Sequence, residues 1–237
     1  MDKSKFTTWA GLDRFKEDKK QFASNVVMVV CAVLCMGISL GFLLETDLGT
    51  DPYTFMNVSI AGKIGWTLGN WQLALNAVML LIVIIVTGIK LIGPGSIANM
   101  VLVGYTVDFT RMLIGRTFPE GFFMGPVARP VTFILGLVGF LISAAVYMNS
   151  RLGLSPYDGS GKIFCNLFKK IPFFITRIVF DSCAVLIGFL FGDAPGIGTI
   201  LMAVFLGPAI TAVGSFMDRY IFKKSEKTYE TLGNEIW

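Results

Sequence analysis

Two charged residues interrupt an apolar run late in the sequence, and their spacing allows them to pair. Arg177 and Asp181 are four residues apart, so on a helix they share one face and can form an ion pair. A charged side chain at the centre of a membrane span costs about 2.5 to 3.5 kcal/mol on insertion scales. We therefore expect this pair either to hold helices together or to contribute to a binding site, with Asp181 the deeper of the two.

Residue types that several enzymes and metal sites need are missing from the chain. It contains no histidine, which excludes Ser-His-Asp and Cys-His catalysis and histidine-based zinc motifs. Cys31, Cys35, Cys165 and Cys183 include no Cys-x-x-Cys, so neither a disulfide framework nor a metal site is predicted. No G-x-x-x-x-G-K-[ST] loop occurs. We expect no enzyme activity and no cofactor, and any pumping would have to draw on existing gradients.

Long apolar runs alternate with polar segments along the chain. Of its 237 residues, 54% are hydrophobic and only 15% are charged, a composition too apolar for a soluble domain of this size. Each run is long enough to cross a hydrocarbon core of ~30 Å as a helix. The pattern predicts an all-α membrane protein with six transmembrane helices, at residues 25–44, 71–89, 97–114, 127–148, 173–191 and 198–217.

The distribution of Lys and Arg predicts the orientation in the membrane. These residues gather in segments 1–24 and 221–237 and in the loops after the second and fourth runs, and cytoplasmic loops carry this excess. Both termini are therefore expected in the cytoplasm. Segment 1–24 has the pattern of a short amphipathic helix on the cytoplasmic leaflet, and we assign the net charge of +4 to lipid headgroups and not to nucleic acid.

A hexapeptide occurs twice, as Leu48-Gly-Thr-Asp-Pro-Tyr53 and Leu152-Gly-Leu-Ser-Pro-Tyr157. Segment 95–104 likewise matches segment 198–207, and Gln72-x-x-x-Asn76 falls opposite Arg177-x-x-x-Asp181. The three matches share a nearly constant separation of about 104 residues, which argues for two homologous halves.

Each half, 25–116 and 117–220, contains three expected spans. Because three is odd, the second half must enter the membrane from the opposite side, so the repeat is inverted. This architecture is found in many secondary transporters and some channels.

Each hexapeptide carries the signal of a helix start. Asp51 before Pro52 is a favoured N-cap followed by Pro at the first helical position, and Ser155 before Pro156 repeats the signal. The first such helix is too short to span, and the second, with Asp158-Gly-Ser-Gly, is expected to be a poorer helix. We interpret both as re-entrant or broken helices after the first span of each half. The alternative is that both lie flat at the membrane interface.

These motifs resemble the YczE/YyaS/YitT-type bacterial integral membrane proteins, and specifically their YczE-like branch. The resemblance is carried by Gly49-Thr-Asp-Pro-Tyr53, by Gly95-Ser-Ile-Ala-Asn-x-x-x-x-Gly104-x-x-x-Asp108, and by Gly196-Ile-Gly-Thr-Ile200 followed by Gly207-Pro208. It implies a multi-pass protein of the bacterial inner membrane, in a family described mostly as uncharacterised or transporter-like, and it implies no particular substrate.

We expect a gradient-driven transporter in which two inverted halves rock around a central site. Carboxylates outnumber cations there, which favours a cationic or neutral small molecule. Asp108 and Arg111, three residues apart, could pair or leave Asp108 at the site. A channel with paired half-helices, a non-transporting subunit that docks a partner protein, and a homodimer remain alternatives. The expected substrate-binding residues are Asp51, Tyr53, Thr54, Asn57, Asn76, Asn99, Asp108, Ser155, Tyr157, Asp158, Arg177 and Asp181.

Overall fold

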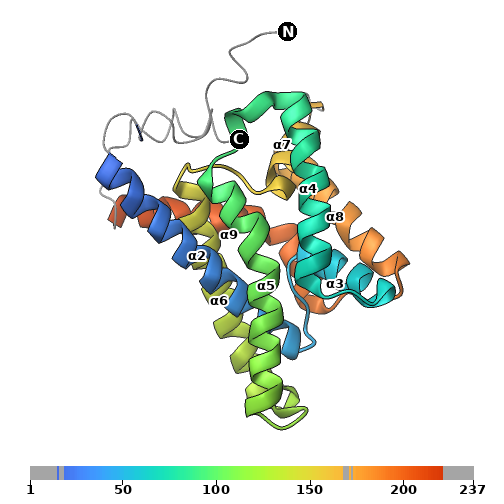
Figure 1. Ribbon diagram of the computed structural model, residues 1–237. Helices are drawn as coiled ribbons and strands as arrows, with labels where there is room; N and C mark the ends of the chain where they lie inside the picture. The colour runs from blue at the N-terminus through green and yellow to red at the C-terminus, as the bar shows by residue number, and fades with distance from the viewer. Residues whose placement is uncertain (1–14, 16–18, 168–170, 172, 221–237) are drawn as a thin grey trace.

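A computed structural model describes residues 15, 19–167, 171 and 173–220, and every regular element within them is helical. Figure 1 shows long helices that form a bundle, with two short helices, α3 and α7, near opposite ends of α4. The expected amphipathic segment at 1–24 and the tail at 221–237 lie largely or wholly outside the described residues. The helices are α2 Lys19–Glu45, α3 Pro52–Ile64, α4 Leu68–Thr87, η2 Gly88–Leu91, α5 Pro94–Thr117, η3 Phe122–Met124, α6 Ala128–Asn149, α7 Pro156–Leu167, α8 Phe173–Leu190 and α9 Ile197–Tyr220.

Five helical segments within the described residues are long and apolar enough to cross a membrane, where the sequence predicted six. They are α2, α4 together with η2, α5, α6 and α9. The remaining long helix, α8, has 18 residues and includes Arg177 and Asp181. Large apolar side chains, such as Ile85, Leu135 and Leu190, are exposed on the outer faces of the helices. Such faces suit contact with lipid acyl chains.

The two short helices begin where the hexapeptides predict. The Asp51 side chain accepts a hydrogen bond from the Thr54 backbone N–H, Pro52 occupies the first turn, and Gly65 ends α3 in the left-handed region. At 13 residues, α3 is ~20 Å long, well short of a hydrocarbon core of ~30 Å. The expectation of a poorer second helix is wrong, because α7 is regular over 12 residues.

Each short helix packs against the second long helix of the other half. Helix α3 contacts α8, and α7 contacts α4. The contacts correspond, since Phe55 of α3 lies against Gly188 of α8 and Gly159 of α7 lies against Val83 of α4. Each short helix also contacts the second long helix of its own half, α3 with α4 and α7 with α8, and α3 contacts α9. Among the long helices, α2 contacts α5 and α6, α6 contacts α9, α4 contacts α5, and α8 contacts α9.

The hexapeptides also join the halves through matched backbone hydrogen bonds. The Gly198 N–H donates to the Leu48 carbonyl at 2.7 Å, and the Gly95 N–H donates to the Leu152 carbonyl at 2.8 Å. Next to these carbonyls, Gly49 and Gly153 have φ values of +113° and +110°. Both turns therefore share one backbone conformation, which favours glycine.

Candidate functional site

The first turns of the two short helices meet through the aromatic rings of Tyr53 and Tyr157. Tyr53 and Tyr157 stack with ring centroids 4.3 Å apart and planes inclined by 29°. The Tyr53 hydroxyl donates to Asn76 Oδ1 at 2.6 Å, and the Tyr157 hydroxyl donates to Asp181 Oδ1 at 2.7 Å. Asn76 in α4 and Asp181 in α8 occupy equivalent positions in the sequence repeat. The two tyrosines therefore make matched hydrogen bonds, one to a neutral amide and the other to a carboxylate.

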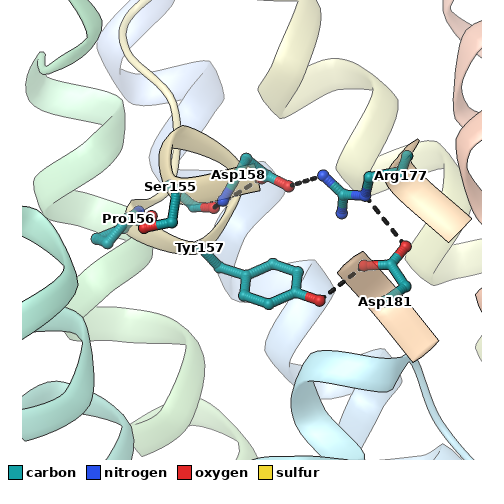
Figure 2. Close-up of polar contacts among 7 residues, drawn as sticks. Ser155, Pro156, Tyr157, Asp158, Arg177 and Asp181 are labelled. Atoms are coloured by element: carbon teal, nitrogen blue, oxygen red, sulfur yellow. Dashed lines mark hydrogen bonds and ion pairs between the residues drawn. The ribbon is translucent and has the colours of Figure 1, made fainter. Parts of the chain in front are cut away.

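Arg177 joins two carboxylates in the second half of the chain, as Figure 2 shows. Its Nε lies 3.0 Å from Asp181 Oδ2, which confirms the predicted pair, and its Nη1 lies 3.0 Å from Asp158 Oδ1. Asp181 is the deeper partner, with 2% of its side chain exposed against 15% for Arg177. The guanidinium also lies 5.4 Å from the centre of the Tyr157 ring, within the range of a cation–π contact.

Asp158 has a second role at the start of α7. The Ser155 hydroxyl accepts a hydrogen bond from the Asp158 backbone N–H at 3.0 Å and donates to Asp158 Oδ2 at 2.6 Å. Asp158 therefore helps to cap α7 in addition to pairing with Arg177. The spacing Ser-x-x-Asp is a variant of the capping box, in which the first and fourth residues stabilise the helix start together.

Asp51 differs from Asp158 and Asp181 because one of its carboxylate oxygens has no hydrogen-bond partner among the described residues. Oδ2 accepts the Thr54 backbone N–H at 3.0 Å, as expected of an N-cap. No described residue donates a hydrogen bond to Oδ1, which is buried, and the residue as a whole is 7% exposed. Buried polar atoms nearly always have a partner, so an exception is a candidate ligand contact.

A cavity of about 90 Å³ lies where these residues meet. It suits a small ligand, since pockets for drug-sized molecules usually measure about 300 to 1,000 Å³. Apolar residues of α2, α6 and α9, such as Leu40, Phe140 and Leu206, complete its wall. The predicted site residues that line it are Asp51, Tyr53, Thr54, Asn99, Ser155, Tyr157, Asp158, Arg177 and Asp181.

Three predicted site residues do not line the cavity. Asn76 lies behind it, bonded to the Tyr53 hydroxyl, and Asn57 donates to the Tyr53 backbone carbonyl at 2.7 Å. Asp108 lies elsewhere and accepts the Gly69 backbone N–H at 2.7 Å, which stabilises the first turn of α4. The considered pairing of Asp108 with Arg111 is not formed, because Arg111 bonds to Glu45 at 2.9 Å.

Two polar residues of the cavity lining, Tyr147 and Gln72, were absent from the predicted set. Tyr147 of α6 is 1% exposed, and no described residue bonds to its hydroxyl. Gln72 of α4 is also buried, and its Oε1 has no partner among the described residues. Gln72 could have been predicted as a site residue, because it is the counterpart of Arg177 in the sequence repeat. Tyr147 carries no signal beyond being an aromatic residue with a polar group inside an apolar run.

Comparisons with known proteins agree with the resemblance seen in the sequence. A family model described as a family of unknown function (DUF6198) matches residues 23–215. The uncharacterised protein YyaS of Bacillus subtilis is 26% identical over 197 residues, which cover 83% of this chain and 94% of YyaS. The uncharacterised membrane protein YczE of the same organism is 26% identical over 179 residues, covering 74% of this chain and 77% of YczE.

An uncharacterised protein of Haemophilus influenzae is 24% identical over 204 residues, covering 86% of this chain and 88% of that protein. No solved structure matches the chain. Together with the helices that are long enough to span a membrane, these relatives identify the chain as a multi-pass integral membrane protein.

Proposed function

Because the chain belongs to the DUF6198 family, whose function is unknown, we propose from its own geometry that it transports a small cationic or neutral molecule across the membrane. The protein is a gradient-driven carrier and not an enzyme. It resides in the bacterial inner membrane with both termini in the cytoplasm. Helix α8 is the sixth span, and its 18 residues give a length of ~27 Å, close to the thickness of the hydrocarbon core.

The inverted repeat is supported by contacts that occur in matched pairs. The hydrogen bonds of Gly198 with Leu48 and of Gly95 with Leu152 are equivalent under the repeat. So are the short-helix contacts of α3 with α8 and of α7 with α4. In this arrangement α3 enters the membrane from the outside and α7 enters from the cytoplasm, as the odd number of spans in each half requires.

The observation that carries the proposal is the cavity between the two helix starts. Tyr53 comes from one half and Tyr157 from the other, and both line the same small cavity with Asp51, Asp158 and Arg177. A site formed by broken helices from two inverted halves is the arrangement that alternating access uses, because rocking one half against the other exposes the site to each side in turn.

Uptake into proteoliposomes tests the proposal, with radiolabelled methylammonium as the probe. A carrier should show saturable uptake that accelerates when unlabelled methylammonium is present on the other side. Arg177→Gln should reduce this uptake, whereas Arg129→Gln, which removes a guanidinium bonded to the Thr46 and Asp47 carbonyls outside the cavity, should not. Non-saturating flux with unitary currents would favour a channel, and the absence of protein-dependent flux would contradict transport of this cation.

A further inference from the structure

The cavity lining carries more negative than positive charge among the described residues, and the carboxylate oxygen that lacks a partner is Oδ1 of Asp51. Three carboxylates, those of Asp51, Asp158 and Asp181, face one guanidinium, that of Arg177, among the described residues of the lining. All four carboxylate oxygens of Asp158 and Asp181 have hydrogen-bond partners. Oδ1 of Asp51 is the carboxylate oxygen without one.

A buried carboxylate in this position must be neutralised. Removing an ionised group from water is strongly unfavourable unless an opposite charge compensates it. Arg177 is held by Asp158 and Asp181, so it is not shared with Asp51 in this conformation. The Thr54 N–H compensates only Oδ2, so we expect Oδ1 to carry either a proton or a bound cation, and it cannot hold both.

The surroundings of Asp51 suit a small cation better than a large one. The cavity measures about 90 Å³. Its lining holds two further buried oxygens without a partner among the described residues, the hydroxyl of Tyr147 and Oε1 of Gln72. The other titratable or charged groups that line it are Tyr53 from α3, Tyr157 and Asp158 from α7, and Arg177 and Asp181 from α8. The described lining residues of α2, α4, α5 and α9 are uncharged.

We propose that Asp51 is an exchange site that binds either a proton or a small monovalent cation, so that binding of the cation displaces the proton. If the protein transports as proposed above, the charge carried by the site stays constant and cation movement in one direction is coupled to proton movement in the other. Binding itself does not depend on transport. The cation is an alkali-metal ion or a small ammonium compound, since both would be attracted by a carboxylate and a hydroxyl oxygen.

Proton release on cation binding tests this exchange. Purified full-length protein in detergent at low buffer capacity is titrated with potassium, sodium or methylammonium chloride while a pH indicator records the released protons. We expect saturable release approaching one proton per chain when Asp51 starts protonated. Release with methylammonium alone would identify a ligand that donates N–H groups, and release with potassium or sodium would identify an alkali-metal site.

Asp51→Asn provides a sharp variant because asparagine caps a helix about as well as aspartate. The substitution removes the exchangeable proton and should abolish the release. Asp47→Asn is the matched control, because the Asp47 side chain is 77% exposed and lies outside the cavity lining, and asparagine tolerates its φ of 51°. This control should release protons as the wild type does.

If Asp51→Asn does not fold, a second measurement on the wild type still tests the proposal: the apparent Kd of the cation is measured at several pH values. Competition predicts that the apparent Kd of the cation rises up to tenfold for each unit of pH below the pKa of the exchange site. Absence of proton release with all three cations, or release that persists in folded Asp51→Asn, would overturn the exchange site. Proton release without uptake into proteoliposomes would instead overturn transport and leave the exchange site standing.

Discussion

The ring of Tyr53 stacks on the ring of Tyr157 with the centroids 4.3 Å apart, and each hydroxyl bonds to the second long helix of its own half. The stack thus joins the two halves at their centre, where α3 and α7 both begin. One hydroxyl meets the neutral Asn76 and the other meets Asp181, so the centre is symmetric in shape and asymmetric in charge. This asymmetry gives the variants below different expected effects.

Arg177→Met should destabilise the protein more than the loss of either of its carboxylate partners. It leaves Asp158 and Asp181 without their shared guanidinium, and breaking a buried ion pair in this way typically costs about 3 to 5 kcal/mol. Combining it with Asp181→Asn should recover part of the loss, because one unpaired carboxylate is then removed. The free energy of unfolding in mixed detergent micelles measures both effects. A double variant as unstable as the sum of its parts would show that the pair does not interact.

Gly49→Ala and Gly153→Ala should each destabilise the protein by at least about 1 to 3 kcal/mol, since alanine is strained in this backbone region. A Cβ on Gly49 would also press on Thr199, and one on Gly153 would press on Ser96. The same unfolding measurement should find Gly62→Ala neutral or slightly stabilising, because Gly62 lies in α3 with open space around it. Equal effects at Gly49 and Gly62 would contradict a special role for the turns.

The orientation predicts which loop positions a membrane-impermeant thiol reagent reaches from outside the cell. Cysteine at Glu120, after α5, or at Asp193, after α8, should be labelled in intact cells. Cysteine at Lys90, in η2, should be labelled only after the membrane is permeabilised. All three positions are exposed in the structure, so burial does not confound the comparison. Labelling of Lys90 and Glu120 from the same side would contradict the inverted repeat.

Local features of the site were predictable from the sequence, and contacts between distant residues were not. The starts of α3 and α7 and the Arg177–Asp181 pair depend on residues at most four positions apart, so spacing alone determines them. The bond between Asp158 and Arg177 depends on how α7 packs against α8, and spacing gives no information about it. Arg111 illustrates the same limit, because its partner Glu45 comes from another helix.

The repeat revealed equivalent positions but not which half each one contacts. From the sequence, α3 and α7 were expected at a shared cavity, and both begin there. Their packing against α8 and α4 of the opposite halves follows from tertiary structure, since the apolar faces of short helices fit many neighbours. Tyr147 was not predicted as a cavity residue for a related reason. The sequence does not show which way a single aromatic side chain in an apolar run points.

Alternating access makes a final prediction about the two short helices. On a background without the four native cysteines, cysteine at Thr54 in α3 and at Ser160 in α7 should react with small thiol reagents from opposite faces of the membrane. Closing one entrance opens the other, so a ligand that favours one conformation should raise one labelling rate and lower the other. Methylammonium is the first ligand to try, and cysteine at Lys63, exposed at the end of α3, is a control whose rate should not change. If both positions react from the same face, α3 and α7 do not enter from opposite sides, and the pairing of Tyr53 with Tyr157 serves only to join the helices.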